Sequence, residues 1–493
     1  MPYRPSRHLL AKCAAVMMLS GLVAVPMALG ASAAVGDAAS RTEPFLPGGP
    51  WSQIQGGATH LGEMEAPMGS PSPQPLAPPY EQAWRFDPTD SAGVSGPVVS
   101  GETVYALGEE SVYAVDLATG EARWSVDRET GPLTVPAVTA SSGDAAPRLV
   151  YTQGVGDKTE LAGLNTGSQQ QTWTVPLEDD AIGDVTLDGG TALVGNSSGK
   201  VFAVDVASGK VVWSVVPIKG RVEVAPAVSG GVVYVVVRST ETGSLMMLAL
   251  DEATGAKKWE AKLGVPGTVV SGLSVTGTSV LAAVYSPIYT VVDSLSTDDG
   301  AVQWTSGIRS ASFLALVRSN LAVSDGRTYV TDITGGVYGI DVASGDRAWD
   351  FQMDSTLQLR SSPVVTGGFI VSGFDDGRLA AFYPSSGHLA WLSEPTGGEV
   401  KSLAVAPGVL VAGIGGDKGG LVAFKHSETG KLTDVVSPTT MAVGSVVLAY
   451  LAALILAGGL ILGLGKLLNE RLRRFAAPED DEAEEPFEAD EEE

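Results

Sequence analysis

The middle of the chain repeats one short pattern, and this pattern limits the possible folds more than any other feature. In its full form an Asp is followed by two variable residues, Thr or Ser, and Gly, and a Trp comes shortly afterwards, as in Asp116 to Gly120 with Trp124. The Gly supplies positive φ and the Asp accepts bonds from backbone amides of the turn. The repeat glycines are Gly120, Gly167, Gly209, Gly255, Gly300, Gly345, Gly387 and Gly430, so successive copies lie 42 to 47 residues apart.

Each repeat contains room for four short strands. In the first copy, apolar segments at 97–99, 103–107 and 111–115 precede the turn, and a segment with Trp124 follows it. A period of 42 to 47 residues with this content is typical of one blade of a β-propeller. The composition agrees, because 61 glycines and only 18% charged residues suit many short strands joined by tight turns. We therefore predict an all-β fold with four-stranded blades.

The tryptophans predict the number of blades. The eighth repeat, with Gly430, has no Trp of its own, whereas Trp84 stands alone before the first repeat in a segment that resembles an outermost strand. If residues 82–87 complete the last blade, residues 81–437 form an eight-bladed ring without an open edge. The eight tryptophans assigned to blades are Trp84, Trp124, Trp173, Trp213, Trp259, Trp304, Trp349 and Trp391.

The repeat, from Ala114 to Trp124 in its first copy, resembles that of the pyrroloquinoline-quinone-type β-propeller superfamily. Residues 51–62 are similar to the lead-in that often precedes such propellers. The resemblance implies that the repeat Trp side chains pack between blades and are structural. It implies little about function, because the superfamily contains quinone-dependent alcohol dehydrogenases and also non-enzymatic scaffolds, among them the lipoprotein subunit of the outer-membrane β-barrel assembly machinery.

Two apolar segments predict the topology. Residues 1–33 read as a signal peptide with an A-x-A cleavage site, an uncleaved anchor being the alternative, and residues 34–80 as a Pro-rich linker. Residues 441–465 carry no charge and are long enough to span a bilayer as one transmembrane helix. Basic residues follow directly, from Lys466 to Arg474, so we expect a cytoplasmic C-terminus and a propeller outside the cytoplasm.

The flanking segments also suggest, and exclude, certain partners. Small residues at four-residue spacing in the helix are compatible with helix-mediated self-association, although Ala and Gly are common in any such helix. The cytoplasmic tail, 466–493, turns from basic to acidic, and its last fifteen residues hold eleven acids. With a net charge of −25, the chain is not expected to bind nucleic acid. Other membrane or envelope proteins are the expected partners.

No set of residues predicts catalysis or a cofactor. Cys13, the single cysteine, lies in the leader, so the adjacent cysteines that the superfamily's dehydrogenases use are absent from the domain. The Gly195 to Gly199 segment matches G-x-S-x-G but is expected to be a hairpin turn. The four histidines are scattered. We therefore expect no enzyme, no cofactor and no metal, and predict a protein-interaction scaffold. A quinone- or metal-dependent oxidoreductase and a sensor of an extracellular small ligand stay open as alternatives.

The loops before the innermost strands are the predicted partner-binding surface, because in a propeller they meet around the channel mouth. They carry charges of both signs, which are either a polar binding rim or ordinary solvated loop residues. The candidates are Arg221, Glu223, Arg318, Arg360, Glu399 and Lys401.

Overall fold

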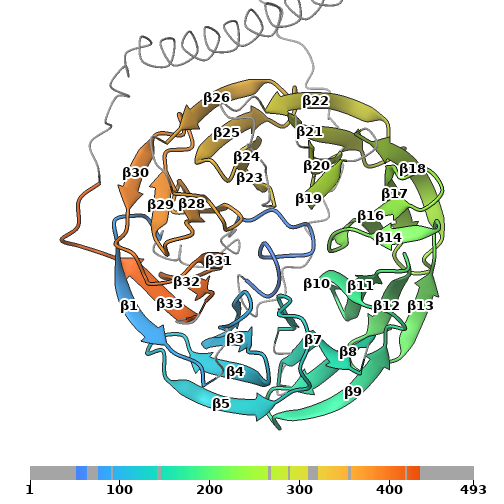
Figure 1. The fold of residues 1–493 in the computed structure, drawn as a ribbon, viewed down its shortest axis with the longest axis horizontal. Coiled ribbons are helices and arrows are strands. Elements are labelled where there is room, and N and C mark those ends of the chain that lie inside the picture. Colours follow the sequence, from blue (N-terminus) through green and yellow to red (C-terminus); the bar gives the residue numbers. More distant parts are fainter. Residues whose placement is uncertain are drawn as a thin grey trace, which may run out of the picture. The chain divides into compact units, whose positions relative to one another are not determined.

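The computed structural model is a ring of eight antiparallel sheets arranged around a central channel (Figure 1). It describes residues 51–63, 76–89, 93–140, 146–156, 158–264, 268–286, 289–308, 320–353, 357–416 and 419–432. The predicted signal peptide (1–33), transmembrane helix (441–465) and tail (466–493) lie outside these residues. Within the described part, no helix has the length and apolarity to cross a membrane.

The first four blades follow the chain from the innermost strand outwards. The first has β2 (Val98–Ser100), β3 (Thr103–Leu107), β4 (Ser111–Asp116) and β5 (Ala122–Asp127); the second has β6 (Ala137–Val138), β7 (Arg148–Val155), β8 (Lys158–Asn165) and β9 (Gln170–Pro176). The third has β10 (Ala181–Asp188), β11 (Thr191–Asn196), β12 (Val201–Asp205) and β13 (Val211–Val215). In the fourth, β14 (Gly220–Val222) and β15 (Ala227–Ser229) share the inner position before β16 (Val232–Ser239), β17 (Leu245–Asp251) and β18 (Lys257–Leu263).

The next three blades repeat this order. The fifth has β19 (Val269–Thr276), β20 (Ser279–Ser286), β21 (Tyr289–Ser296) and β22 (Val302–Ile308). The sixth has β23 (Ala322–Ser324), β24 (Arg327–Thr331), β25 (Gly336–Asp341) and β26 (Arg347–Gln352). The seventh has β27 (Val364–Thr366), β28 (Phe369–Gly373), β29 (Leu379–Phe382) and β30 (Leu389–Leu392).

The eighth blade is built from both ends of the domain. Its inner strands are β31 (Val400–Ala406), β32 (Val409–Ile414) and β33 (Gly420–His426), and its outermost strand is β1 (Tyr80–Phe86). β1 pairs antiparallel with β33, from Tyr80 opposite His426 to Phe86 opposite Leu421. The predictions of eight four-stranded blades, and of Trp84 in the last of them, are confirmed. Because β1 pairs with β33, the two ends of the domain are joined in one sheet and the edge of β33 is covered.

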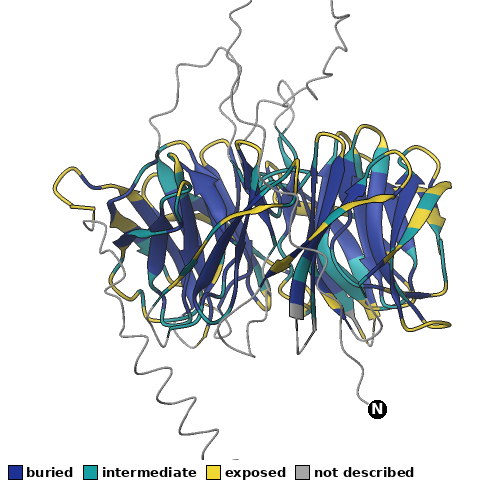
Figure 2. Cartoon of the chain, turned by 90° about the horizontal axis from the view of Figure 1, so that it is seen from above, coloured by how far each residue is buried: buried dark blue, intermediate teal, exposed yellow. Residues whose placement is uncertain are grey.

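The core consists of apolar layers between neighbouring blades. The middle strands are buried along their length, as in β3. The residues of the outermost strands are exposed or only partly buried, as in β5 (Figure 2). One such layer packs Val150 and Leu161 of the second blade against Val194 and Phe202 of the third. Each blade therefore buries its faces against its neighbours, and the ring is held together by burial of apolar area.

The repeat Trp and Gly join consecutive blades. Trp84 donates its indole N–H to Leu117 O at 2.9 Å, in the turn of the following blade. Trp173, Trp213, Trp259, Trp304 and Trp349 make the same contact with Val206, Glu252, Thr297, Val342 and Pro384, at 2.7 to 2.9 Å. The ring of each lies on the turn Gly of that blade, and the second repeat departs from this pattern, with positive φ at Gln169 and not at Gly167. Trp124 packs beside Tyr105 and Trp391 beside Tyr80.

Candidate functional site

Residues 51–63 lie inside the channel, where they form the dark blue loop at the centre of Figure 1. Their carbonyl oxygens accept backbone N–H bonds from the innermost strands of six blades, at 2.7 to 2.9 Å. The donors are Val99, Val138, Val228, Val275, Val323 and Val365, and the acceptors are Trp51, Ser52, Ala58, Thr59, Leu61 and Gly62. We call residues 51–63 the plug. Part of the predicted 34–80 linker is thus packed within the ring.

Side chains of the plug also form hydrogen bonds with residues around the channel. Gln53 supplies the contact to the third blade, donating to Leu187 O at 2.8 Å and accepting from Leu187 N at 2.6 Å. Gln55 donates to Leu321 O at 2.9 Å. His60 is buried, with Nε2 3.2 Å from Thr186 Oγ1, and burial lowers its pKa to about 4. A neutral imidazole therefore suits this position at pH 7.

The innermost strands present a second layer of residues to the channel. In seven blades, one residue stands three positions before the residue that bonds the plug. The eighth blade has a residue at the equivalent place. We call these eight positions the inner ring: Gly96, Val135, Asp184, Ala225, Gly272, Asn320, Ser362 and Ser402. Gly96 lies close to both of its neighbours in this ring, because an added Cβ would come within 2.6 Å of Val135 and 2.8 Å of Ser402 Oγ.

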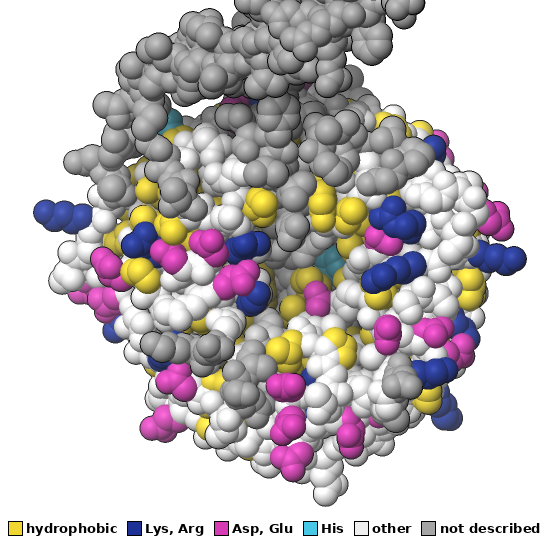
Figure 3. Space-filling model, in the orientation of Figure 1, with side chains coloured by type: hydrophobic (Ala, Val, Ile, Leu, Met, Phe, Trp, Pro, Cys, Tyr) yellow, Lys and Arg dark blue, Asp and Glu magenta, His cyan; other side chains and the backbone are white. Residues whose placement is uncertain are grey.

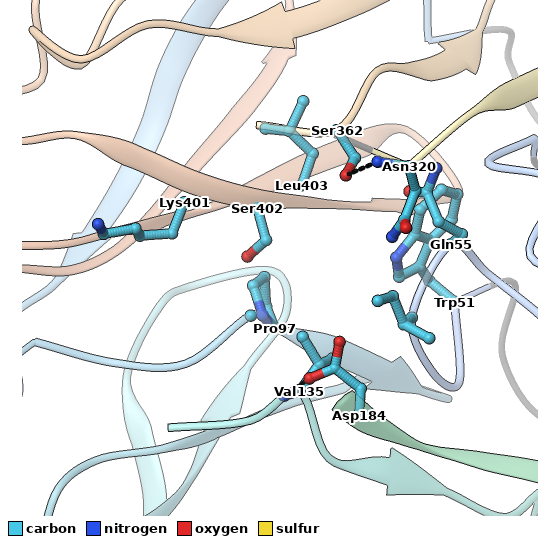
Figure 4. Close-up of a pocket in the computed structure, with 12 residues that line it drawn as sticks. Trp51, Gln55, Pro97, Val135, Asp184, Asn320, Ser362, Lys401, Ser402 and Leu403 are labelled. Carbon is cyan, nitrogen blue, oxygen red and sulfur yellow. Dashed lines mark hydrogen bonds between the residues drawn. The ribbon is translucent and has the colours of Figure 1, made fainter. Parts of the chain in front are cut away.

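A pocket of about 190 Å³ lies between the inner ring and the plug (Figure 4). Six inner-ring residues line it, from the first, second, third, sixth, seventh and eighth blades. Trp51, Ile54 and Gln55 of the plug also border the pocket, and Pro97, Lys401 and Leu403 complete the lining. The pocket is thus enclosed by segments from six blades and by the plug.

Asp184 is the acid of this pocket. It lies in β10 where the pairing with β11 shifts between Ile182 and Thr186, next to Gly183 with φ of 76°. Such a bulge redirects a side chain relative to regular pairing. One carboxylate oxygen accepts a bond from Val135 N at 2.6 Å. Desolvation raises the pKa of Asp184 to about 6, against the lowering effect of that bond.

Three of the predicted rim residues come together. Glu399, at the start of the eighth blade, contacts Lys401 Nζ at 2.6 Å and lies 3.8 Å from Arg360 Nε of the seventh. Glu223 instead pairs with Arg238 at 2.9 Å within the fourth blade, where Arg221 is exposed. Arg318 lies outside the described residues. Charges of both signs surround the hollow at the centre of the face in Figure 3.

The chain matches one known protein family over most of its length. A family described as "Outer membrane protein assembly factor BamB" matches residues 80–169, 157–315 and 248–461. The chain belongs to this family. The BamB of Moranella endobia is 25% identical over 215 residues, which are 42% of this chain and 53% of that protein. The match therefore spans about half the length of that relative.

A solved structure and a further curated relative extend the comparison. The crystal structure of BamB from Moraxella catarrhalis superposes with a TM-score of 0.55 at 18% identity, over 70% of this chain and 99% of that one. A polyvinylalcohol dehydrogenase of Sphingopyxis is 22% identical over 86% of this chain and 85% of its own. Membership of the BamB family thus agrees with the predicted superfamily and confirms the predicted fold.

The described part of the channel shows no acid cluster for the calcium-bound quinone that the wider superfamily suggests. Within the described residues, no group of three His, Cys, Asp or Glu side chains is arranged to hold a metal ion. The pocket of about 190 Å³ is also smaller than the roughly 300 to 1,000 Å³ usual for small-molecule sites.

Asp184 and the plug were not among the predicted site residues. The signal for Asp184 is present in the repeats, because it occupies a position where the other blades have uncharged residues. Residues 51–62 of the plug are the segment that is similar to the lead-in of such propellers. That similarity does not say that its carbonyls would bond the innermost strands.

Proposed function

We propose that this BamB-family propeller is a protein-interaction scaffold outside the cytoplasm, held to a membrane by one C-terminal helix, and that it serves assembly of an envelope or membrane complex. The family match over residues 80–461 carries the proposal. The matching curated relatives named as assembly factors give the class of process, and the partner is accordingly another membrane or envelope protein.

The membrane anchor in this proposal comes from the sequence. Residues 441–465 are uncharged, and Lys466 to Arg474 follow them on the side that the positive-inside rule assigns to the cytoplasm. The helix also offers a surface for self-association.

The closed channel supports a binding role on the ring surface. The plug bonds the innermost strands of seven blades, through six backbone pairs and Gln53. Among the described residues, Arg360, Glu399 and Lys401 are partly exposed at the channel mouth, and Lys401 also lines the pocket. We propose this mouth as the partner surface, where polar contacts between charged groups fix register and orientation.

Cross-linking in intact membranes tests the scaffold. The full chain is compared with a chain that ends after Arg474 and with the Glu399→Arg variant. This substitution replaces the carboxylate that contacts Arg360 and Lys401 by a third cation. We expect a reproducible set of captured envelope proteins, reduced by Glu399→Arg and retained by the truncated chain. Glu260→Arg, on an outermost strand where Glu260 pairs with Lys257, is the control and should capture the same set. Recovery of no reproducible partner with any chain would contradict the proposal.

An oxidoreductase is the second candidate, because the polyvinylalcohol dehydrogenase covers 86% of this chain. The lack of fit between the channel and a calcium-bound quinone argues against it. Absorbance of protein loaded with quinone and calcium decides between the two. Saturable quinone binding with dye reduction would favour the oxidoreductase, and no binding at millimolar quinone would remove it.

A further inference from the structure

The repeat register singles out one residue of the inner ring. Seven of its eight positions carry uncharged residues, which are Gly, Val, Ala, Asn or Ser, and the third blade carries Asp184. A charged residue at a position that the fold fills with small neutral ones is not needed for the propeller itself. Asp184 is half-buried, and partial transfer of a carboxylate out of water is unfavourable unless a partner compensates. The position therefore indicates a ligand.

The carboxylate of Asp184 is only partly satisfied by the protein. One oxygen accepts from Val135 N at 2.6 Å, and the carboxylate faces the pocket in Figure 4. A carboxylate has about four acceptor positions in all. Among the described residues, no further donor lies within hydrogen-bond reach of Asp184. The remaining acceptor positions are available to a group that enters the pocket.

The rest of the lining adds polar oxygens. Ser402 Oγ is buried without a hydrogen-bond partner among the described residues. Gln55 uses its amide nitrogen on the backbone oxygens of Leu321 and Pro363, which leaves its side-chain oxygen as an acceptor. Ser362 Oγ accepts from Asn320 N. These oxygens add acceptors to the pocket for a ligand that carries several donors.

The cation nearest in sequence to the pocket is directed elsewhere. Lys401 contributes its stem to the lining, but Figure 4 shows its chain extending away from Asp184 and Trp51. Its Nζ contacts Glu399 at 2.6 Å. Within the described residues, the charge of Asp184 is therefore not paired with a cation of the chain.

We infer that this pocket receives the guanidinium of an arginine from a partner polypeptide, with Asp184 as its counter-ion. The inference rests on the proposed scaffold function and names the group that the partner inserts. A guanidinium has five donors in a planar fork, suits carboxylates in bidentate geometry and is weakly hydrated. A cavity of about 190 Å³ is on the scale of one long side chain and not of a folded segment. Arginine anchors in pockets are frequent hot spots of interfaces.

The test uses the full chain in detergent, labelled with 5-fluorotryptophan, because Trp51 borders the pocket. The ¹⁹F resonance of Trp51 is assigned with Trp51→Phe. The probe is an acetylated and amidated Ala-Ala-Arg-Ala-Ala peptide, with Lys, Glu and Leu analogues and free arginine as further arms. We expect a saturable shift for the Arg peptide with a dissociation constant on the order of 1 mM, weaker binding of the Lys peptide, and none of the Glu and Leu peptides.

Asp184→Asn is the decisive variant, because Asn keeps the shape and can still accept from Val135 N. It should weaken the Arg peptide at least tenfold without unfolding, whereas Asp188→Asn, on the same strand outside the inner ring, should change binding less than twofold. Absence of a saturable shift, equal binding of the Leu peptide, tighter binding of free arginine than of the peptide, or an unaffected Asp184→Asn would each overturn the inference. Cross-linking with Asp184→Asn separates the two proposals: partners captured normally by that variant would leave the scaffold standing and remove the arginine anchor.

Discussion

The indole ring of Trp84, on the outermost strand of the eighth blade, lies directly on Gly120 in the turn of the neighbouring first blade. A Cβ added at Gly120 would come within 2.6 Å of the Trp84 ring, and Gly120 has φ of 76°. The indole N–H continues the contact to Leu117 O at 2.9 Å. The same pairing recurs at five further junctions, at Gly209, Gly255, Gly300, Gly345 and Gly387, so one repeated turn joins most neighbouring sheets.

This contact predicts that Gly120→Ala is strongly destabilising. The new methyl would overlap the Trp84 ring and the backbone would be strained, which together should lower the free energy of unfolding by about 2 to 4 kcal/mol. Gly101→Ala is the matched control, because Gly101 also has positive φ but nothing within 4 Å of the added Cβ. Its cost should be about 1 kcal/mol. Urea unfolding measures both, and equal effects would mean that the Trp84 contact contributes nothing.

Truncation of Trp84 should separate packing from hydrogen bonding. Trp84 is 8% exposed, and replacement of a buried Trp by Ala costs about 3 to 5 kcal/mol. Trp84→Phe keeps much of the buried area and loses the bond to Leu117 O, for which about 1 kcal/mol is expected. Thermal and urea unfolding of the two variants give the comparison. A Phe variant as unstable as the Ala variant would place the main effect in the hydrogen bond.

Gln53 should control how firmly the plug is held to the third blade. Gln53→Ala removes both bonds to Leu187 and leaves its buried N–H and C=O without those partners, at about 2 to 4 kcal/mol. Hydrogen exchange of the Leu187 amide should accelerate far more than that of Val204 in β12 of the same blade. Uniform acceleration of both amides would indicate global unfolding and not local release of the plug.

His60 predicts a loss of stability in mild acid. Its pKa falls from 6.5 to about 4 on folding, so the unfolded chain binds the proton more readily and stability decreases as pH drops from about 6.5 to 4. A shift of this size corresponds to about 3 kcal/mol. Asp184 acts in the opposite sense, because its pKa is raised to about 6 and folding is favoured as that carboxyl is protonated.

His60→Gln isolates the histidine contribution. The variant removes the titration, retains a side chain that can bond Thr186, and leaves Asp184 in place. Urea midpoints between pH 4 and 7 should fall more steeply with acid in the original chain than in the variant. Parallel curves would show that His60 does not titrate differently in the folded and unfolded states.

Prediction from sequence succeeded where a residue's role is local and repeated. The Asp-x-x-Thr-Gly turns, the strands before them and the Trp after them recur at a nearly constant interval, so they define a blade without knowledge of distant contacts. The missing Trp after Gly430 and the extra one at Trp84 also sufficed to predict closure of the ring, now seen as β1 paired with β33.

The sequence alone thus determined the architecture, because a repeat carries its own strands, turns and inter-blade contacts in fewer than fifty residues. Only the tertiary structure placed residues 51–63 in the channel and separated Arg360, Glu399 and Lys401 from Glu223. It also placed Asp184 beside Val135, 49 residues away in the chain. Such neighbours meet because the ring brings eight separate strands to one axis. That convergence leaves no local pattern along the chain, since the members of the site come from several different repeats.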